Sequence, residues 1–120
     1  MIALLIADLA LIPVQPTPFD AWGAQEAVSL AQEARRRRKG KRLPLVSLVP
    51  YRTIHNRLSR DLPAVLADLG ETVAPGVGNR TPIVEAAIVG RTVTEYAPRS
   101  KAADEVRKLA RHVTGRLGRI

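Results

Sequence analysis

The stretch LALIPVQPTPFDAWG, residues 9–23, most constrains how this chain folds. It begins as a short apolar run, which is typical of a strand buried on both faces, and it holds three prolines within six residues. Proline lacks the N–H that a strand ladder needs, so these residues end the strand. Thr17 or Asp20 is then available to cap a helix in which alanine and valine recur at helical spacing. We therefore predict a strand over residues 10–15, a stiff corner, and a helix over residues 19–38.

The rest of the chain continues to alternate between strand and helix patterns. A second buried strand is expected over residues 43–49, parallel to the first because a helix separates them, with residues 50–53 as a loop. Pro63 should either kink the next helix, around residues 58–69, or restart it with Asp61 as its cap. Further expectations are a strand over 71–74, a loop over 75–81, a turn over 92–96, and helices over 82–89 and 102–117. The pattern predicts an α/β fold in one domain over residues 1–120, with a short parallel sheet flanked by helices.

The charge of the chain indicates a polyanionic partner. The formal net charge is +8 and the isoelectric point is about 11.0, and nucleic acid is the partner that such a balance favours. Seven of the eight residues at 35–42 are basic, and a second basic block runs from Arg99 through Lys101, Arg107, Lys108, Arg111 and Arg116 to Arg119. With four aromatic residues, base stacking has little support, so we expect phosphate contacts without sequence reading. The alternative is a set of solvated surfaces, since Arg35, Arg36, Arg37 and Arg38 also suit a helix C-terminus that ends at Gly40.

Several other classes of protein are disfavoured. The absence of cysteine and the two isolated histidines argue against a disulfide scaffold or a zinc site, and we expect no metal ligands. The apolar opening lacks a basic leading region, carries Asp8, and is too short to span a bilayer, so we expect a cytoplasmic protein without a membrane partner.

No motif for catalysis stands out. A phosphate-binding P-loop requires G-x-x-x-x-G-K-[ST], and GKR at Gly40 lacks the first glycine and the hydroxyl. GVGNRT at Gly76 resembles the start of a dinucleotide fingerprint, but Thr81 stands at the third glycine, and an ordinary strand-to-helix loop is favoured. His55, Ser59 and Asp61 should point around a helix instead of converging as a triad.

Three segments together resemble one family. ADLALIPVQPTPFDAWG, LPLVSLVPYRT and GNRTPIVEAAIVGRTVTEYAPRSKAADEVRKLA are similar, in order and spacing over residues 7–113, to the C-terminal half of ParA-type partition ATPases, relatives of MinD. EYAPRSKAADE is the most specific match. The resemblance implies a three-layer P-loop NTPase fold that dimerises around ATP and Mg²⁺. It also implies non-specific binding to duplex DNA, a ParB-type centromere-binding partner and a place on the nucleoid.

The same resemblance implies two sets of site residues. Those expected to form a nucleotide-binding wall are Pro16, Asp20, Ser47, Pro75, Gly76, Gly78, Asn79 and Arg80. Arg52, Arg99, Lys101, Arg107, Lys108 and Arg111 are expected to contact DNA, beside the run Arg35, Arg36, Arg37 and Arg38 that the charge pattern suggests. Two departures stand out: Ser47 replaces the family's usual Asn, and Pro82 lies within the loop-helix junction.

In the family, both Walker motifs precede the segment that begins here at Ala7, and the resemblance implies that residues 1–7 are the end of a helix that precedes the strand. We therefore expect a partial P-loop NTPase-like fold that lacks the N-terminal P-loop half, with no bound cofactor and no ATPase activity for this chain alone. An exposed apolar edge and face should follow, and with them self-association or a homodimer. The alternatives are a stand-alone basic DNA-binding accessory and a truncated gene product.

Overall fold

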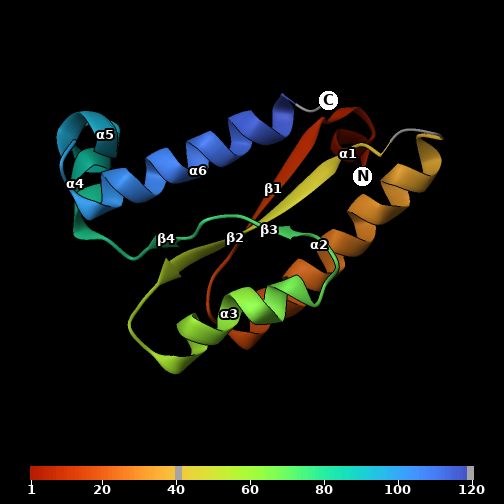
Figure 1. Cartoon of the computed structure of the whole chain (residues 1–120), viewed down its shortest axis with the longest axis horizontal. Helices are drawn as coiled ribbons and strands as arrows, with labels where there is room; N and C mark the ends of the chain where they lie inside the picture. The colour runs from red at the N-terminus through yellow and green to blue at the C-terminus, as the bar shows by residue number, and fades with distance from the viewer. Residues whose placement is uncertain (40–41, 119–120) are drawn as a thin grey trace.

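The structure, a computed structural model, describes residues 1–39 and 42–118. Its elements are α1 (Ile2–Ile6), β1 (Leu9–Val14), α2 (Pro18–Arg37), β2 (Leu45–Thr53), α3 (Arg57–Ala67), β3 (Thr72–Val73), β4 (Val77–Gly78), α4 (Thr81–Ile88), α5 (Val93–Tyr96) and α6 (Lys101–Leu117). β2 is central and pairs in parallel with β1, β3 and β4. The expected α/β fold with a short parallel sheet is confirmed at this level (Figure 1).

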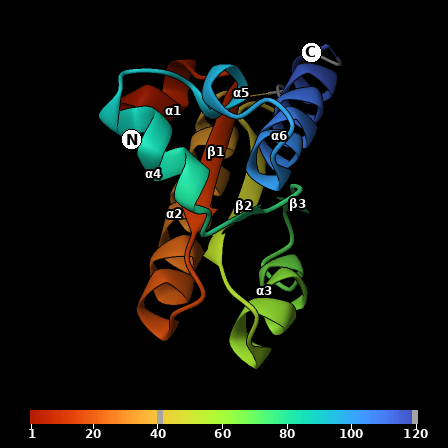
Figure 2. The same ribbon diagram turned by 90° about the vertical axis from the view of Figure 1, so that its left-hand side faces the viewer.

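The sheet lies between two layers of helices. α2 and α3 pack on one face, and α6 lies over the other (Figure 1). Figure 2 shows the same elements from another side, with α3 below the strands and α6 beside their upper part. α4 and α5 gather beside the N-terminal end of α6 through a small apolar cluster. The main core fills the space between the sheet, α2 and α3, and its buried members are Val14, Ala24, Val28, Ala31, Val46, Leu48, Leu62 and Leu66.

The proline corner forms as the sequence predicts. β1 ends at Val14, and α2 begins at Pro18, where the fixed φ of proline suits the first helical position. The Thr17 hydroxyl accepts a hydrogen bond from the Asp20 amide at 3.1 Å, and the Asp20 carboxylate accepts one from the Gln15 amide at 2.9 Å. These two bonds fix the conformation of the corner between the strand and the helix.

β2 is longer than its sequence pattern suggests. Residues 50–53, expected as a loop, continue the strand to Thr53. Its last residues pair with β4, at Tyr51 to Val77 and Thr53 to Gly78, so the loop expected over 75–81 also contains a strand. Each of these segments forms a strand because the other supplies its backbone partners, and neither has a strand pattern of its own.

Pro63 does not restart α3. The helix runs without interruption from Arg57 to Ala67, and Asn56 caps it by accepting a hydrogen bond from the Ser59 amide at 2.8 Å. The alternative with Asp61 as a cap is therefore wrong. Leu62 and Leu66 are buried in the core on either side of the proline, and this packing holds the helix together despite the missing N–H.

The remaining helices follow their predictions closely. α4 and α6 cover the ranges expected for helices, and α1 covers most of residues 1–7. The expected turn over 92–96 is a single helical turn, α5, which Thr92 and Glu95 cap reciprocally. Gly90 follows α4 with a φ of 69°, a conformation that glycine adopts without strain.

Candidate functional site

The four-arginine run divides into structural and exposed members. The Arg35 guanidinium forms a two-pronged ion pair with Glu71, at 3.0 and 2.5 Å, and donates to the Pro44 carbonyl at 2.9 Å. Arg38 donates to the carbonyls of Leu4 and Ala7, and so ties α1 to the end of α2. Arg36 and Arg37 remain exposed. Gly40, the expected helix end, lies outside the described residues, as do Lys41 and Arg119.

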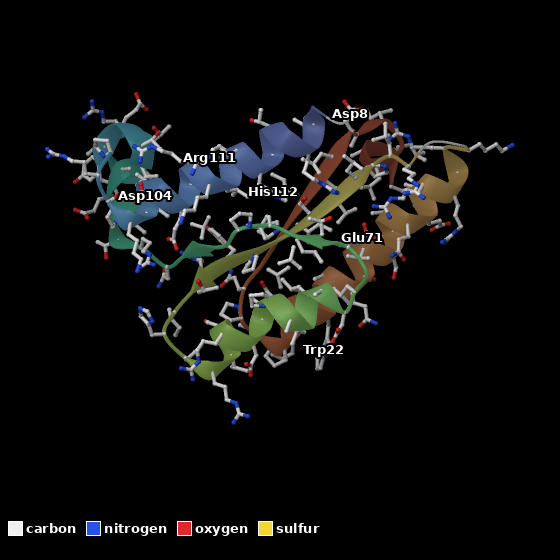
Figure 3. All side chains as sticks on the ribbon, viewed as in Figure 1. Asp8, Trp22, Glu71, Asp104, Arg111 and His112 are labelled. Atoms are coloured by element: carbon white, nitrogen blue, oxygen red, sulfur yellow. The ribbon has the colours of Figure 1, made fainter. Side chains whose placement is uncertain are left out.

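α6 presents a basic stripe to solvent. Lys101, Lys108 and Arg111 are exposed and lie on one side of the helix, because their spacing of seven and three residues brings them into line. Arg107 lies next to them and is held by the Asp104 carboxylate at 3.2 Å and the Pro98 carbonyl at 2.7 Å. The other side of α6 faces the sheet, where His112 contacts Ser47 (Figure 3). We call Lys101, Lys108 and Arg111 the α6 stripe.

Arg52 occupies an unusual backbone position near the end of β2. Its φ is 55°, in the left-handed region that non-glycine residues rarely adopt. The two residue steps from Tyr51 to Thr53 on β2 lie opposite the single step from Val77 to Gly78 on β4, which is a β-bulge. The guanidinium is exposed and lies 5.9 Å from the centre of the Tyr51 ring. The bulge therefore turns a cation outward at the carboxyl end of the sheet.

The expected DNA-contacting residues fall at two ends of the molecule. Arg52 and the start of α6 share the carboxyl end of the sheet, where the Gly78 backbone pairs with β2 and also donates to Glu105 at 3.2 Å. Arg99, also exposed, lies two residues before α6 begins. The run at 35–38 lies at the opposite end, since α2 runs back toward the start of the strands. The run at 35–38 therefore does not share a surface with Arg52 and the start of α6.

Asn79 and Arg80 of the expected nucleotide-binding wall line an open pocket. The pocket has a volume of about 320 Å³ and is lined by Thr53, Ile54, His55, Ser59, Arg60, Asn79 and Arg80. It lies at the carboxyl ends of parallel strands, which is where α/β sheets generally bind ligands. The sequence did not single out Thr53 or Arg60 as pocket residues, and the signal that could have found them is their place after a parallel strand.

The two glycines of this loop serve chain packing. A Cβ on Gly76 would approach the Pro50 carbonyl oxygen to 3.0 Å, and one on Gly78 would meet the Arg80 guanidinium at 2.9 Å. Pro75, beside them, is exposed. The Asn79 amide donates to the Thr53 carbonyl at 2.9 Å, which fixes the loop against β2.

Arg80 is paired within the chain. Its guanidinium donates to both oxygens of Glu105, at 3.0 and 3.3 Å. Burial acts to raise the pKa of Glu105, but the hydrogen bonds from Arg80 and the Gly78 amide outweigh it and lower that pKa. The hydrogen bond to Glu105 raises the pKa of Arg80 in turn. Glu105 was missed by the sequence analysis, and it joins α6 to the loop that was expected to bind a nucleotide.

Other members of the expected nucleotide wall lie apart from this pocket. Ser47 is buried in the middle of β2, and its hydroxyl lies 2.8 Å from His112 Nε2. Pro16 and Asp20 follow β1, whose last pair with β2 is Val14 to Pro50. β2 extends three residues farther, about 10 Å at the usual strand rise, before the pocket begins. Of the eight residues, the structure brings Asn79 and Arg80 into the pocket and Gly76 and Gly78 next to it.

The Ser59 hydroxyl accepts a hydrogen bond from the Ile54 amide at 3.0 Å. Ser59 and His55 line the same pocket, whereas Asp61 does not line it. Ser59 thus belongs to the start of α3, and the three residues do not form a triad.

The residues present do not fit a complete Mg²⁺–ATP site. Among the described residues there is no group of three His, Cys, Asp or Glu side chains that could hold a metal ion, and Asp20 is bonded to the backbone of its own corner. In the described ranges, no helix is long and apolar enough to cross a bilayer. No protein-family model matches the sequence, and no curated protein matches it significantly.

Proposed function

We propose that this chain is a ParA-like partition protein portion that contacts the phosphates of duplex DNA without reading its sequence. The observation that carries this proposal is the α6 stripe, which places three cations on one exposed face within about 15 Å of helix length. The ordered resemblance over residues 7–113 and the parallel α/β sheet support the ParA-like part of the proposal. Association with the nucleoid in the cytoplasm would follow from such binding.

The test is binding to a fluorescent random-sequence duplex at several salt concentrations. We expect the logarithm of affinity to fall linearly with the logarithm of salt, with a slope of about −0.9 for each phosphate neutralised. The double variant Lys108→Gln and Arg111→Gln should bind more weakly and lower that slope by about 2.

A matched control removes the same charge elsewhere. Arg57→Gln with Arg60→Gln lies on α3, below the opposite face of the sheet from α6 (Figure 2). This control should retain most of the binding. Equal losses in the two double variants, or binding that ignores salt, would refute phosphate contact through α6.

For nucleotide binding, we propose only that this chain forms one wall of the binding site. The pocket beside Asn79 and Arg80 would lie against a base, and the phosphate-binding groups would come from outside residues 7–113. We expect no ATP hydrolysis by this chain alone, and turnover above the buffer background by purified protein would contradict that expectation. A homodimer and a ParB-type partner are further parts of the same proposal.

The stand-alone DNA-binding accessory is the second candidate. It is favoured by the exposure of the α6 stripe, because the three side chains are presented to solvent without a bound nucleotide. DNA affinity that is unchanged by ATP and by a ParB-type protein would support the accessory over the partition protein. The third alternative, a truncated gene product, predicts a Walker A motif encoded immediately upstream.

A further inference from the structure

A second open pocket lies at the opposite end of the sheet from Arg52. Its volume is about 330 Å³, and it is lined by Arg35, Arg42, Leu45, Gly70, Glu71, Thr72 and Arg116. Leu45 and Thr72 are the first residues of β2 and β3, so the pocket lies at the amino ends of the strands. The charged side chains come from α2, α6 and two connecting segments, and Glu71 marks the place in Figure 3. We call this the arginine pocket.

The charges around the arginine pocket do not cancel. Three guanidinium groups face a single carboxylate, which leaves a net charge of +2. The two oxygens of Glu71 are already engaged by Arg35, at 3.0 and 2.5 Å, and by the Gln32 amide at 3.2 Å. Arg42 is exposed and forms no hydrogen bond or ion pair with a described residue. Arg42 and Arg116 therefore carry the uncompensated charge.

Arg116 also has an unsatisfied hydrogen-bond donor. Its Nη2 donates to the Val46 carbonyl at 3.0 Å, whereas its Nε is buried and has no partner among the described residues. A buried donor without a partner is uncommon in proteins and is a reason to look for a missing acceptor. Arg116 also lines a neighbouring hollow together with Thr72, His112 and Gly115. An oxyanion in the arginine pocket would supply the missing negative charge beside Arg116.

We propose that the arginine pocket binds a phosphate group, either as inorganic phosphate or as part of a larger molecule. Guanidinium groups match the planar pairs of oxygens that phosphate presents, and the net charge of +2 suits a dianion better than a single carboxylate. The pocket is much larger than one phosphate, so it also admits a phosphate ester or a backbone phosphodiester. This inference does not depend on the proposed function, because it uses a different end of the sheet and different side chains.

Binding is tested by titrating isotope-labelled protein with sodium phosphate while ionic strength is held constant with sodium chloride. Phosphate should shift the NMR signals of Arg116 Nε–H and of the Glu71 and Thr72 amides, with a saturating curve. Arg42→Gln should weaken phosphate binding about fivefold or more, because it removes an exposed cation without disturbing a helix or strand. Arg116→Gln should do the same, and circular dichroism checks that each variant is folded.

Arg57→Gln is the matched control, since it removes one exposed cation from α3. The proposal is overturned if phosphate moves these signals no farther than chloride does, or if Arg42→Gln and Arg57→Gln weaken binding equally. A second arm uses a short DNA duplex. Competition between duplex and inorganic phosphate, with both weakened by Arg42→Gln, assigns the pocket to nucleic-acid phosphate. Phosphate binding that falls in Arg42→Gln while duplex binding stays constant assigns it to a free phosphate or phosphate ester.

Discussion

At the scale of single residues, Glu71 joins α2 to the segment before β3. It lies just before β3 and accepts hydrogen bonds from Arg35 and Gln32 of α2, and its side chain is 8% exposed. Burial acts to raise the pKa of Glu71. The hydrogen bonds from Arg35 and Gln32, and the charges of Arg35 and Arg116, outweigh burial and hold that pKa below its ordinary value. The ionised carboxylate is thus the form that the fold stabilises.

Glu71→Gln should therefore lower the free energy of unfolding at pH 7 by about 1.5 to 3 kcal/mol. Because the folded-state pKa is lowered, the carboxylate contributes stability above its ordinary pKa of 4.5, and this contribution is lost as pH falls through the folded-state value. Urea unfolding from neutral to acidic pH measures the effect, and the two proteins should converge at the acidic end. Glu33→Gln, in an exposed pair with Arg37, is the control and should change stability by about 0.5 kcal/mol or less. A constant difference at all pH values would contradict the assignment.

Substitution by alanine should have opposite effects on stability at Gly76 and at Gly23. Gly76→Ala would place a Cβ 3.0 Å from the Pro50 carbonyl oxygen and 3.1 Å from the Pro50 Cβ, so it should destabilise the protein by about 1 to 3 kcal/mol. Gly23→Ala adds its Cβ in open space within α2 and should stabilise the protein by about 0.5 to 1 kcal/mol. Thermal unfolding distinguishes them. A Gly76→Ala protein as stable as the parent would show that β2 and the loop approach less closely than described.

At the scale of elements, two substitutions at the bulge in β2 distinguish the effect of backbone strain from the effect of charge. Arg52→Gly removes the charge and also the cost of a left-handed φ, which is about 1 kcal/mol for a non-glycine residue. Arg52→Gln removes the charge and keeps that cost. Both variants should reduce the salt slope of DNA binding by about 1, but Arg52→Gly alone should gain stability. Unaltered DNA binding in both variants would exclude Arg52 from the interface.

α6 both packs on the sheet and presents basic side chains to solvent. Glu105, His112 and Arg116 face the sheet and bond to Gly78, Ser47 and Val46, while the α6 stripe remains exposed. The amphipathic pattern predicted the helix and its apolar contacts. It did not predict that polar and charged side chains would dock the helix on the strands, because their partners lie 27 to 70 residues away in sequence.

At the scale of the whole molecule, β1 forms one edge of the described sheet. Leu11, at its centre, is 43% exposed. A long apolar edge strand is a template for pairing with another chain. Phe19 and Trp22, which follow in α2, are 77% and 64% exposed and make an edge-to-face pair with ring centres 5.6 Å apart. The exposed edge strand and the exposed aromatic pair each agree with the proposed self-association.

Leu11→Lys should shift the protein toward the monomer, since a charge on an edge strand opposes pairing. Size-exclusion chromatography with light scattering, over a range of protein concentrations, measures the change. Leu58→Lys is the control, because Leu58 is also exposed but lies on α3. A clean monomer in the parent protein at high concentration would contradict self-association, and an effect of Leu58→Lys equal to that of Leu11→Lys would assign it to another surface.

The sequence by itself determined the local course of the chain. Pro16, Pro18 and the Thr17 cap set the corner after β1, and apolar periodicity located α2, α3, α4 and α6 to within one or two residues. Such features depend on neighbours within a few residues, so pattern and propensity describe them well.

Tertiary structure decided which charges are free and where the strands end. β4 and the last residues of β2 form because they pair with each other, and Arg35 and Arg38 are structural because Glu71 and the α1 carbonyls lie beside them. The basic run at 35–38 and the α6 stripe look alike in sequence, yet the fold places Arg35 in an ion pair and leaves Lys108 exposed. Local periodicity does not predict pairing between residues that are far apart in sequence, because each partner's environment exists only after the chain has folded.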